Sequence, residues 1–304
     1  MTTRETAAGV LPGAADTSAG GPADMYFEDF VVGQRFTSGP RTVTESDLAD
    51  FTRISGDDHP LHTDPDHPAG FGRPVLQGPF GLAVAMGLLQ ELGLVRDAVL
   101  GLLDSHWSYR RPVFVGDVLH LELTIVRRRR SRRGDRGVVT RHMALVDQDG
   151  AVVQDGTTAV LLRARGDAAA DPVERDFGTV AWGEALAARL AADPEFGPAV
   201  ESWDGTIGLR AGAHEVHLRV YRGAIIEVSS RAALGATFTV EADELTWTEL
   251  VTAPTNEFTR RSMTGQFAVR GNGYEYLRLT RPLTLVVDAA RALAAGATET
   301  EARA

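Results

Sequence analysis

The most apolar part of the chain lies in residues 75–92, VLQGPFGLAVAMGLLQEL, and it is the strongest indication of the fold. The apolar run from Gly81 to Leu92 predicts a fully buried helix. Pro79 suits the first turn of that helix, because a residue there does not need its N–H for a helical hydrogen bond. Gly78 has no side chain, so the backbone can approach a ligand closely. We therefore expect a buried helix whose N-terminus faces a ligand.

The segment before this helix, SGDDHPLH at residues 55–62, contains chemically active side chains. Asp57 and His62 are separated by a proline-containing turn and can converge on one water molecule. A carboxylate and an imidazole on the same water are what addition to, or elimination from, an activated double bond requires. The N–H of Gly78 at the helix start is suited to stabilise a developing oxyanion. A turn-forming and helix-capping role for the same residues is the alternative.

At this point residues 26–165 resemble a known family, the MaoC-like R-specific enoyl-CoA hydratases and dehydratases. The resemblance rests on SGDDHPLH (55–62), FGRPVLQGPFG (71–81) and RPVFVGD (111–117), in this order. It implies an α+β hot-dog fold, in which a curved antiparallel sheet wraps a long central helix, and a homodimer. It also implies that Asp57 and His62 are the catalytic pair and that the Gly78 amide binds the thioester oxygen.

Three positions depart from the pattern of this family. His59 stands where the family commonly has Asn, Gln77 where it has His, and Pro79 where it has Met. His59 and Gln77 are therefore candidates for substrate binding beside Gly78, and the departures leave the shape of the substrate and the identity of the nucleophile open. The imidazole of His59 either adds a second base or replaces the hydrogen bonds of the amide.

The chain length of 304 residues and the pattern after the central helix indicate two different domains. Alternation typical of strands runs from about 106 to 163, and a small-residue, acidic stretch follows it. We expect a disordered tail at 1–24, the hot-dog domain at 25–165, a linker at 166–178, a second domain at 179–296 and a tail at 297–304.

The second domain restarts with a helix near 181–192 and closes with a helix that places Leu283, Val286, Val287 and Ala290 on one face. A Trp-containing helix at 247–253 and a strand reading MTGQFAVRG at 263–271 lie between them. This half resembles a smaller α+β domain, the sterol carrier protein type 2 domain. The resemblance implies a lipid ligand in an apolar tunnel. A domain without a tunnel, used for dimerisation or docking, is the alternative.

Composition excludes several classes of chemistry. The count of 31 Lys and Arg residues is all Arg, which excludes Schiff-base lysines, and the absence of Cys excludes thiol nucleophiles and thiolate metal sites. A net charge of −10 argues against nucleic-acid binding. No apolar run is long enough to span a membrane. We expect a cytoplasmic protein without a metal ion or a redox cofactor.

The run VRRRRSRRGDRG at residues 126–137 is the strongest local charge bias. It lies between two strand-like segments, so the sequence favours a solvated hairpin tip with Gly134 in the turn. The alternative is a site for the phosphates of coenzyme A or for an acidic carrier protein.

The residues together predict a hydro-lyase that adds water to an enoyl thioester of coenzyme A or of an acyl carrier protein, or removes it from a 3-hydroxyacyl thioester. One alternative keeps the site and changes the chemistry to addition of an amine or hydrolysis. Another is a non-catalytic protein that binds acyl thioesters or lipids.

Overall fold

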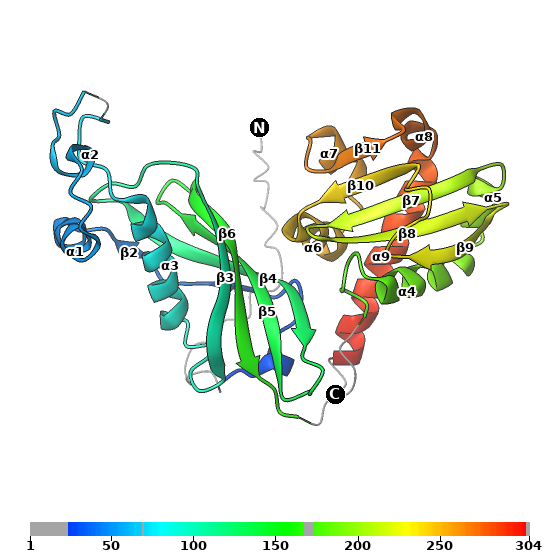
Figure 1. Cartoon of the computed structure of the whole chain (residues 1–304), viewed down its shortest axis with the longest axis horizontal. Helices are drawn as coiled ribbons and strands as arrows, with labels where there is room; N and C mark the ends of the chain where they lie inside the picture. The colour runs from blue at the N-terminus through cyan, green and yellow to red at the C-terminus, as the bar shows by residue number, and fades with distance from the viewer. Residues whose placement is uncertain (1–23, 69, 167–172, 302–304) are drawn as a thin grey trace, which may run out of the picture.

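The computed structural model describes residues 24–68, 70–166 and 173–301, with side chains up to residue 296. It contains two sheet-and-helix domains side by side (Figure 1). The predicted tail at 1–24 lies outside the described residues except for Asp24, and most of the predicted linker core, 167–172, also lies outside them. The end of that linker belongs to the second domain, because Phe177 is 1% exposed in its core.

The first domain contains an antiparallel sheet of six strands. They are β1 (Arg35–Thr37), β2 (Arg41–Thr42), β3 (Val99–Tyr109), β4 (Val118–Arg130), β5 (Arg136–Val146) and β6 (Val152–Arg163). The strand order is β1-β4-β5-β6-β3, with β2 also paired to β4. Three helices complete the domain, namely α1 (Glu45–Ser55), α2 (Pro60–Thr63) and α3 (Gly78–Glu91), together with the short turn η1 (Phe27–Asp29).

The helix α3 packs on one face of this sheet (Figure 1). The prediction that it is fully buried is wrong, because Ala83 and Gly87 are exposed. Val84, Ala85 and Leu88 are at most 1% exposed and contact alternate side chains of the strands. In β4 the residues Leu119, Leu121, Leu123 and Ile125 are all buried, because side chains two apart share one face. Burial of each such side chain contributes roughly 1.5–3 kcal/mol. The expected hot-dog arrangement of a central helix on an antiparallel sheet is confirmed.

The arginine run forms the predicted hairpin, since β4 ends at Arg130 and β5 begins at Arg136. Gly134 has a φ of 76° in its turn. The prediction of a solvated tip is wrong for Arg127 and Arg130, whose side chains are 12% and 14% exposed. Arg130 pairs with Glu28 at 2.8 Å. These guanidinium groups are occupied in holding neighbouring segments together.

The second domain has a five-stranded sheet and the remaining helices. The strands are β7 (Asp204–Ala211), β8 (His214–Tyr221), β9 (Ala224–Ser229), β10 (Phe238–Ala242) and β11 (Ala268–Gly271), in the order β11-β10-β7-β8-β9. The helices are α4 (Val180–Ala191), α5 (Phe196–Val200), α6 (Glu244–Thr252), α7 (Phe258–Met263), α8 (Gly273–Arg278) and α9 (Thr280–Glu301). The β7–β10 pair is parallel and the other pairs are antiparallel.

One expectation for this domain, the buried face of its closing helix, is met, and two are corrected. The four residues predicted on one face of the closing helix are at most 2% exposed. The predicted strand at 263–271 is wrong in its first half, because Met263 ends α7 and β11 begins only at Ala268. Residues from 297 onwards, assigned to a tail, continue α9 to Glu301.

Arg127 of β4 forms hydrogen bonds with residues of the second domain. Its guanidinium donates to Glu244 of α6 at 2.6 Å, to Asp176 at 3.0 Å and to the carbonyl of Phe177 at 3.0 Å. Val32 of the first domain lies in the core cluster of the second. Among the described residues, no helix is long and apolar enough to cross a membrane.

Candidate functional site

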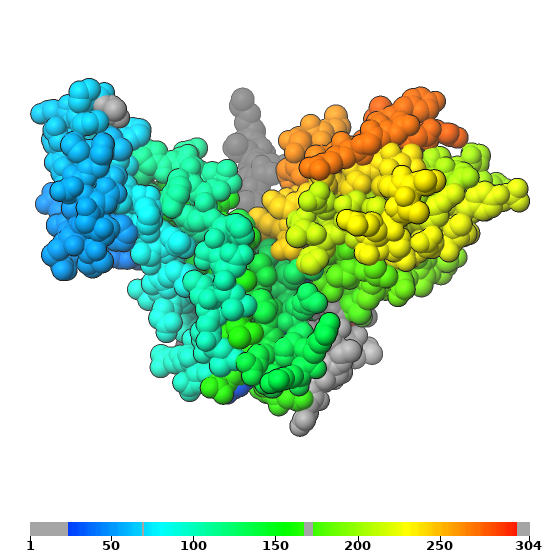
Figure 2. All heavy atoms as spheres, viewed as in Figure 1, coloured from blue at the N-terminus to red at the C-terminus, as the bar shows by residue number. Residues whose placement is uncertain are grey.

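Asp57 and His62 lie together at the end of the first domain that faces away from the second domain. Gly56 ends α1 in a left-handed conformation with a φ of 72°, which turns the chain so that Asp57 enters the loop before α2. His62 lies in α2, and its Nε2 is 3.6 Å from Oδ2 of Asp57. Figure 2 shows this segment, in blue, at the outer end of the molecule. The predicted pair is therefore brought together at the surface.

The hydrogen bond of the other ring nitrogen orients His62. Nδ1 lies 2.6 Å from the carbonyl oxygen of Val75. A carbonyl only accepts, so Nδ1 carries the proton and donates it, and Nε2 of the neutral ring presents a lone pair. The separation of 3.6 Å between Nε2 and Asp57 is too long for a direct hydrogen bond. His62 is largely buried while Asp57 is half-exposed, so Nε2 is available to accept a proton on the side that Asp57 faces.

Gly78 supplies a backbone donor beside this pair. It is the first residue of α3, and within the described ranges its N–H has no hydrogen-bond acceptor. A Cβ built on Gly78 would lie 3.1 Å from the Tyr109 ring, so the ring covers the glycine closely. The N-terminus of a helix carries partial positive charge, which favours a negative oxygen at this N–H.

Gln77 connects the loop of Asp57 to the start of α3. The side chain is 1% exposed, and its Nε2 donates to the carbonyl of Asp57 at 2.9 Å and to Oγ1 of Thr52 at 2.8 Å. We expected Gln77 to contact substrate. Its amide nitrogen holds Asp57 next to the helix that carries Gly78, and its buried Oε1 has no hydrogen-bond partner among the described residues. Substrate binding by Gln77 stays a prediction.

The first domain is similar to known proteins. Residues 29–146 match the model of the MaoC like domain family. The chain is 30% identical over 141 residues to the (R)-specific enoyl-CoA hydratase of Aeromonas caviae, covering 45% of this chain and 99% of that protein.

The chain belongs to the MaoC-like dehydratase family.

Two further relatives are each similar to about a third of this chain. The 3-hydroxybutyryl-CoA dehydratase of Methylorubrum extorquens is 31% identical over 121 residues, 36% of this chain and 71% of that protein. Protein MaoC of Klebsiella aerogenes is 32% identical over 109 residues, which is 35% of this chain and 32% of that longer protein. The MaoC-like domain is thus an enzyme domain of the hydratase and dehydratase kind, consistent with the hydro-lyase that the sequence predicts.

His59 of the MaoC-like domain caps the short helix that carries His62. Its Nδ1 accepts the N–H of Leu61 at 3.1 Å, and its ring lies 6.4 Å from that of His62 between centroids. The side chain is exposed. The contact with Leu61 supports the interpretation that His59 replaces the hydrogen bonds of an amide, because a ring nitrogen that accepts an N–H in this way has its lone pair occupied.

Sequence reasoning missed the support behind Gly78, which comes from Gln154 of β6. Nε2 of Gln154 donates to the carbonyl of Gly78 at 3.2 Å, and its Oε1 accepts from Nε1 of Trp107 at 2.8 Å. A Cβ on Gly81 would lie 2.2 Å from Oε1 of Gln154, so Gly81 leaves the space that this amide fills. Two glycines three residues apart lie on one side of a helix, and this spacing is the signal that points to a close contact there.

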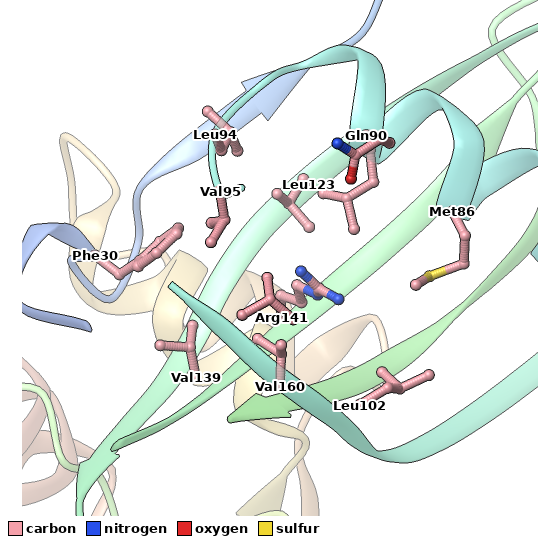
Figure 3. A pocket seen from close by; sticks show the side chains of 12 residues that line it. Phe30, Met86, Gln90, Leu94, Val95, Leu102, Leu123, Val139, Arg141 and Val160 are labelled. Atoms are coloured by element: carbon pink, nitrogen blue, oxygen red, sulfur yellow. The ribbon is translucent and has the colours of Figure 1, made fainter. Parts of the chain in front are cut away.

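An apolar cavity of about 140 Å³ lies farther along α3. Figure 3 shows that the sheet and α3 both contribute side chains to it. Its lining is Phe30, Met86, Leu89, Gln90, Leu94, Val95, Val99, Leu102, Leu123, Val139, Arg141 and Val160. With a rise of 1.5 Å per residue, Leu89 is about 16 Å along the helix from Gly78. The cavity and the Asp57–His62 pair therefore lie at opposite ends of α3.

Metal ligation receives no support from the described part of the chain, where no three His, Asp or Glu side chains are grouped to hold an ion.

Proposed function

We propose that this protein adds water reversibly to a 2-enoyl thioester, carried by coenzyme A or by an acyl carrier protein. The observation that carries the proposal is the arrangement at the start of α3. His62 presents Nε2 toward Asp57 and is hydrogen-bonded to the carbonyl of Val75. Gln77 donates to the backbone of Asp57, and the N–H of the next residue, Gly78, has no acceptor in the part of the chain that the structure describes. These contacts gather a base, a carboxylate and an oxyanion donor at one place.

The proposed reaction uses each group once. The thioester oxygen accepts the N–H of Gly78, which draws electron density from the double bond and makes the third carbon electrophilic. Neutral Nε2 of His62 takes a proton from a water held against Asp57, and the hydroxyl bonds to the third carbon. The proton then returns from the pair to the second carbon, so one water adds across one double bond. Removal of water follows the same path in reverse.

The direct test is the absorbance of the unsaturated thioester. Crotonyl-CoA incubated with the full chain loses that absorbance, and mass spectrometry of the product shows the mass of the substrate plus one water. With an amine added to the incubation, a product carrying that amine identifies conjugate addition instead, and free coenzyme A identifies hydrolysis. Unchanged crotonyl-CoA together with unchanged longer enoyl-CoAs and enoyl-carrier proteins would contradict the proposal.

A homodimer built through β3 is part of this proposal. β3 ends the strand order, so one of its edges has no neighbour in the sheet that the structure describes. Large apolar side chains are exposed along it, with Leu102 51%, Leu103 56% and Tyr109 56% exposed. A long edge strand with exposed apolar residues tends to pair with another chain. We infer that two copies of β3 pair antiparallel to form one continuous sheet.

This pairing would complete the acyl site. Full-length antiparallel pairing of two copies of Val99–Tyr109 sets Val99 of one copy opposite Tyr109 of the other. Val99 lines the apolar cavity, and the ring of Tyr109 covers Gly78. The catalytic end of one copy therefore adjoins the cavity of the other copy. Within a single copy, the length of α3 separates the two.

We expect Leu103→Asp to disrupt this dimer. A carboxylate on the paired edge must lose its water to be buried, which is unfavourable without a partner. Sedimentation should show a monomer, and hydration of crotonyl-CoA should fall at least about tenfold, because the groups that hold the substrate are no longer placed together. The control is Ile226→Asp on the edge strand β9 of the second domain, where Ile226 is 59% exposed. A fully active Leu103→Asp monomer would disprove the shared site.

For the second domain we propose a sterol-carrier-like fold with a filled interior. The Trp247 helix α6, the strand β11 and the closing helix α9 support the resemblance. Aromatic rings pack in its core, with centroids 6.4 Å apart for Trp182 and Trp247 and 5.1 Å apart for Trp247 and Phe267. Such packing favours a docking domain, held by Arg127, over a lipid tunnel.

Mass spectrometry of an organic extract of the purified full chain tests this point. We expect no lipid in stoichiometric amount, because the rings fill the space between sheet and helices. One lipid per chain, lost on Phe267→Ala, would instead support the lipid ligand that the resemblance implies. The cytoplasmic location stays a prediction of the sequence.

A further inference from the structure

Arg141 lies where the fold gives it no obvious structural task. It belongs to β5, and its side chain is on the same face of the sheet as Val139 and Met143, under α3. The residue is 8% exposed. Figure 3 shows its guanidinium directed into the apolar cavity, among side chains of Leu123, Val139 and Val160. A charged group is thus built into an apolar interior.

Among the described residues, no carboxylate neutralises the cation of Arg141. Nε donates to Oγ1 of Thr158 at 2.8 Å, and within the described ranges no carboxylate pairs with the terminal nitrogens. Burial lowers the pKa of Arg141 to about 10, so the group remains charged at neutral pH. By contrast, Arg127 and Arg130, also largely buried, each bind a carboxylate. Arg141 therefore has the environment expected of a cation that binds an anionic ligand.

The cavity limits what that anion can be. Its volume of about 140 Å³ is close to that of a cavity that holds benzene, so it admits a group of roughly six non-hydrogen atoms. Its lining is apolar except for Arg141 and Gln90, which sits on α3. A planar carboxylate matches the two parallel donors of a guanidinium. Methylene groups behind it would contact the apolar walls.

We propose that this cavity receives the far end of an acyl chain that ends in a carboxylate, and that Arg141 binds this carboxylate and selects the substrate. The inference rests on the proposed hydration of an enoyl thioester, for which it names the substrate class: short ω-carboxy-2-enoyl thioesters. Because the cavity and Gly78 lie at opposite ends of α3, the thioester would be held by one copy of the chain and the carboxylate by the other.

The test compares two substrates of nearly equal shape. Glutaconyl-CoA ends in a carboxylate, and 5-methylhex-2-enoyl-CoA carries an isopropyl group in its place. Wild-type protein should hydrate the first with the higher kcat/KM. Arg141→Leu should reduce the ratio of the two kcat/KM values on the order of 100-fold, mainly by loss on the acid. Arg141→Lys keeps the charge but not the two parallel donors of the guanidinium. Its ratio of kcat/KM values should lie between those of the wild type and of Arg141→Leu.

Arg132→Leu is the matched control, because Arg132 is exposed in the hairpin turn and the substitution changes the net charge equally. It should leave the ratio unchanged. Equal wild-type kcat/KM values for the two substrates, or an Arg141→Leu protein that loses both activities alike, would overturn the role of Arg141.

A binding measurement separates failure of this inference from failure of the proposed reaction. Calorimetry of wild-type protein with glutaryl-CoA and 5-methylhexanoyl-CoA, which cannot be hydrated, should show tighter binding of the acid, and Arg141→Leu should abolish the difference. If neither enoyl-CoA reacts but the acid still binds through Arg141, the reaction is wrong and the recognition stands. If the acid binds no better than its neutral analogue, the recognition is wrong even where hydration occurs.

Discussion

His62→Ala should lower kcat/KM for hydration of an enoyl-CoA about 1000-fold, because the variant has no group to take the proton from water. Asp57→Asn should cause a loss of similar size, since the amide lacks the negative charge that Oδ2 presents 3.6 Å from Nε2 of His62. Both variants should remain folded, because neither side chain belongs to a core cluster. The measurement is the initial rate of loss of the enoyl absorbance.

Asp58→Asn and His120→Ala are the matched controls. Asp58 is exposed next to Asp57, and His120 lies on β4 outside the site. Each control removes the same chemical group as its partner variant and should retain wild-type kcat/KM. If His62→Ala and Asp57→Asn were as active as these controls, the pair would be structural and the α1–α2 segment would not be the active site.

Gly81→Ala should destabilise the first domain by about 2–4 kcal/mol. The new Cβ would lie 2.2 Å from Oε1 of Gln154, which is buried and accepts from Trp107 while its amide nitrogen donates to Gly78. The glutamine must move, and both hydrogen bonds are lost or distorted. The start of α3 then loses its support, so activity of the folded variant should also fall.

Gly87→Ala provides a control on the same helix with the opposite expected sign. A Cβ at Gly87 meets nothing within 4 Å, and the residue is exposed. Alanine favours a helix over glycine, so this variant should gain about 0.5–1 kcal/mol. Calorimetric unfolding of the full chain measures both. A Gly81→Ala protein as stable as Gly87→Ala would show that Gln154 does not need the space.

Local sequence patterns predicted the parts of the fold that depend on one element at a time. The apolar run after Pro79 predicts a buried helix, and α3 has Val84, Ala85 and Leu88 in the core. The alternation after His106 predicts strands. The errors occur where a short segment is ambiguous or a partner lies far away in sequence. Met263 begins an alternating run but ends a helix. Arg127 lies in a charged run that predicts a solvated tip, but in the folded chain it pairs with Glu244 and Asp176.

The groups that we propose for the chemistry can be picked out from the sequence alone, because Asp57, His62 and Gly78 lie in short motifs whose spacing is recognisable without long-range contacts. How those groups are held depends on contacts between segments that are distant in the sequence. Gln77 holds the backbone of Asp57 and Gln154 holds Gly78, through contacts 20 and 76 residues apart. Arg141 is one arginine of many in the sequence, and its direction into an apolar cavity follows from sheet register and helix packing, which no local pattern encodes.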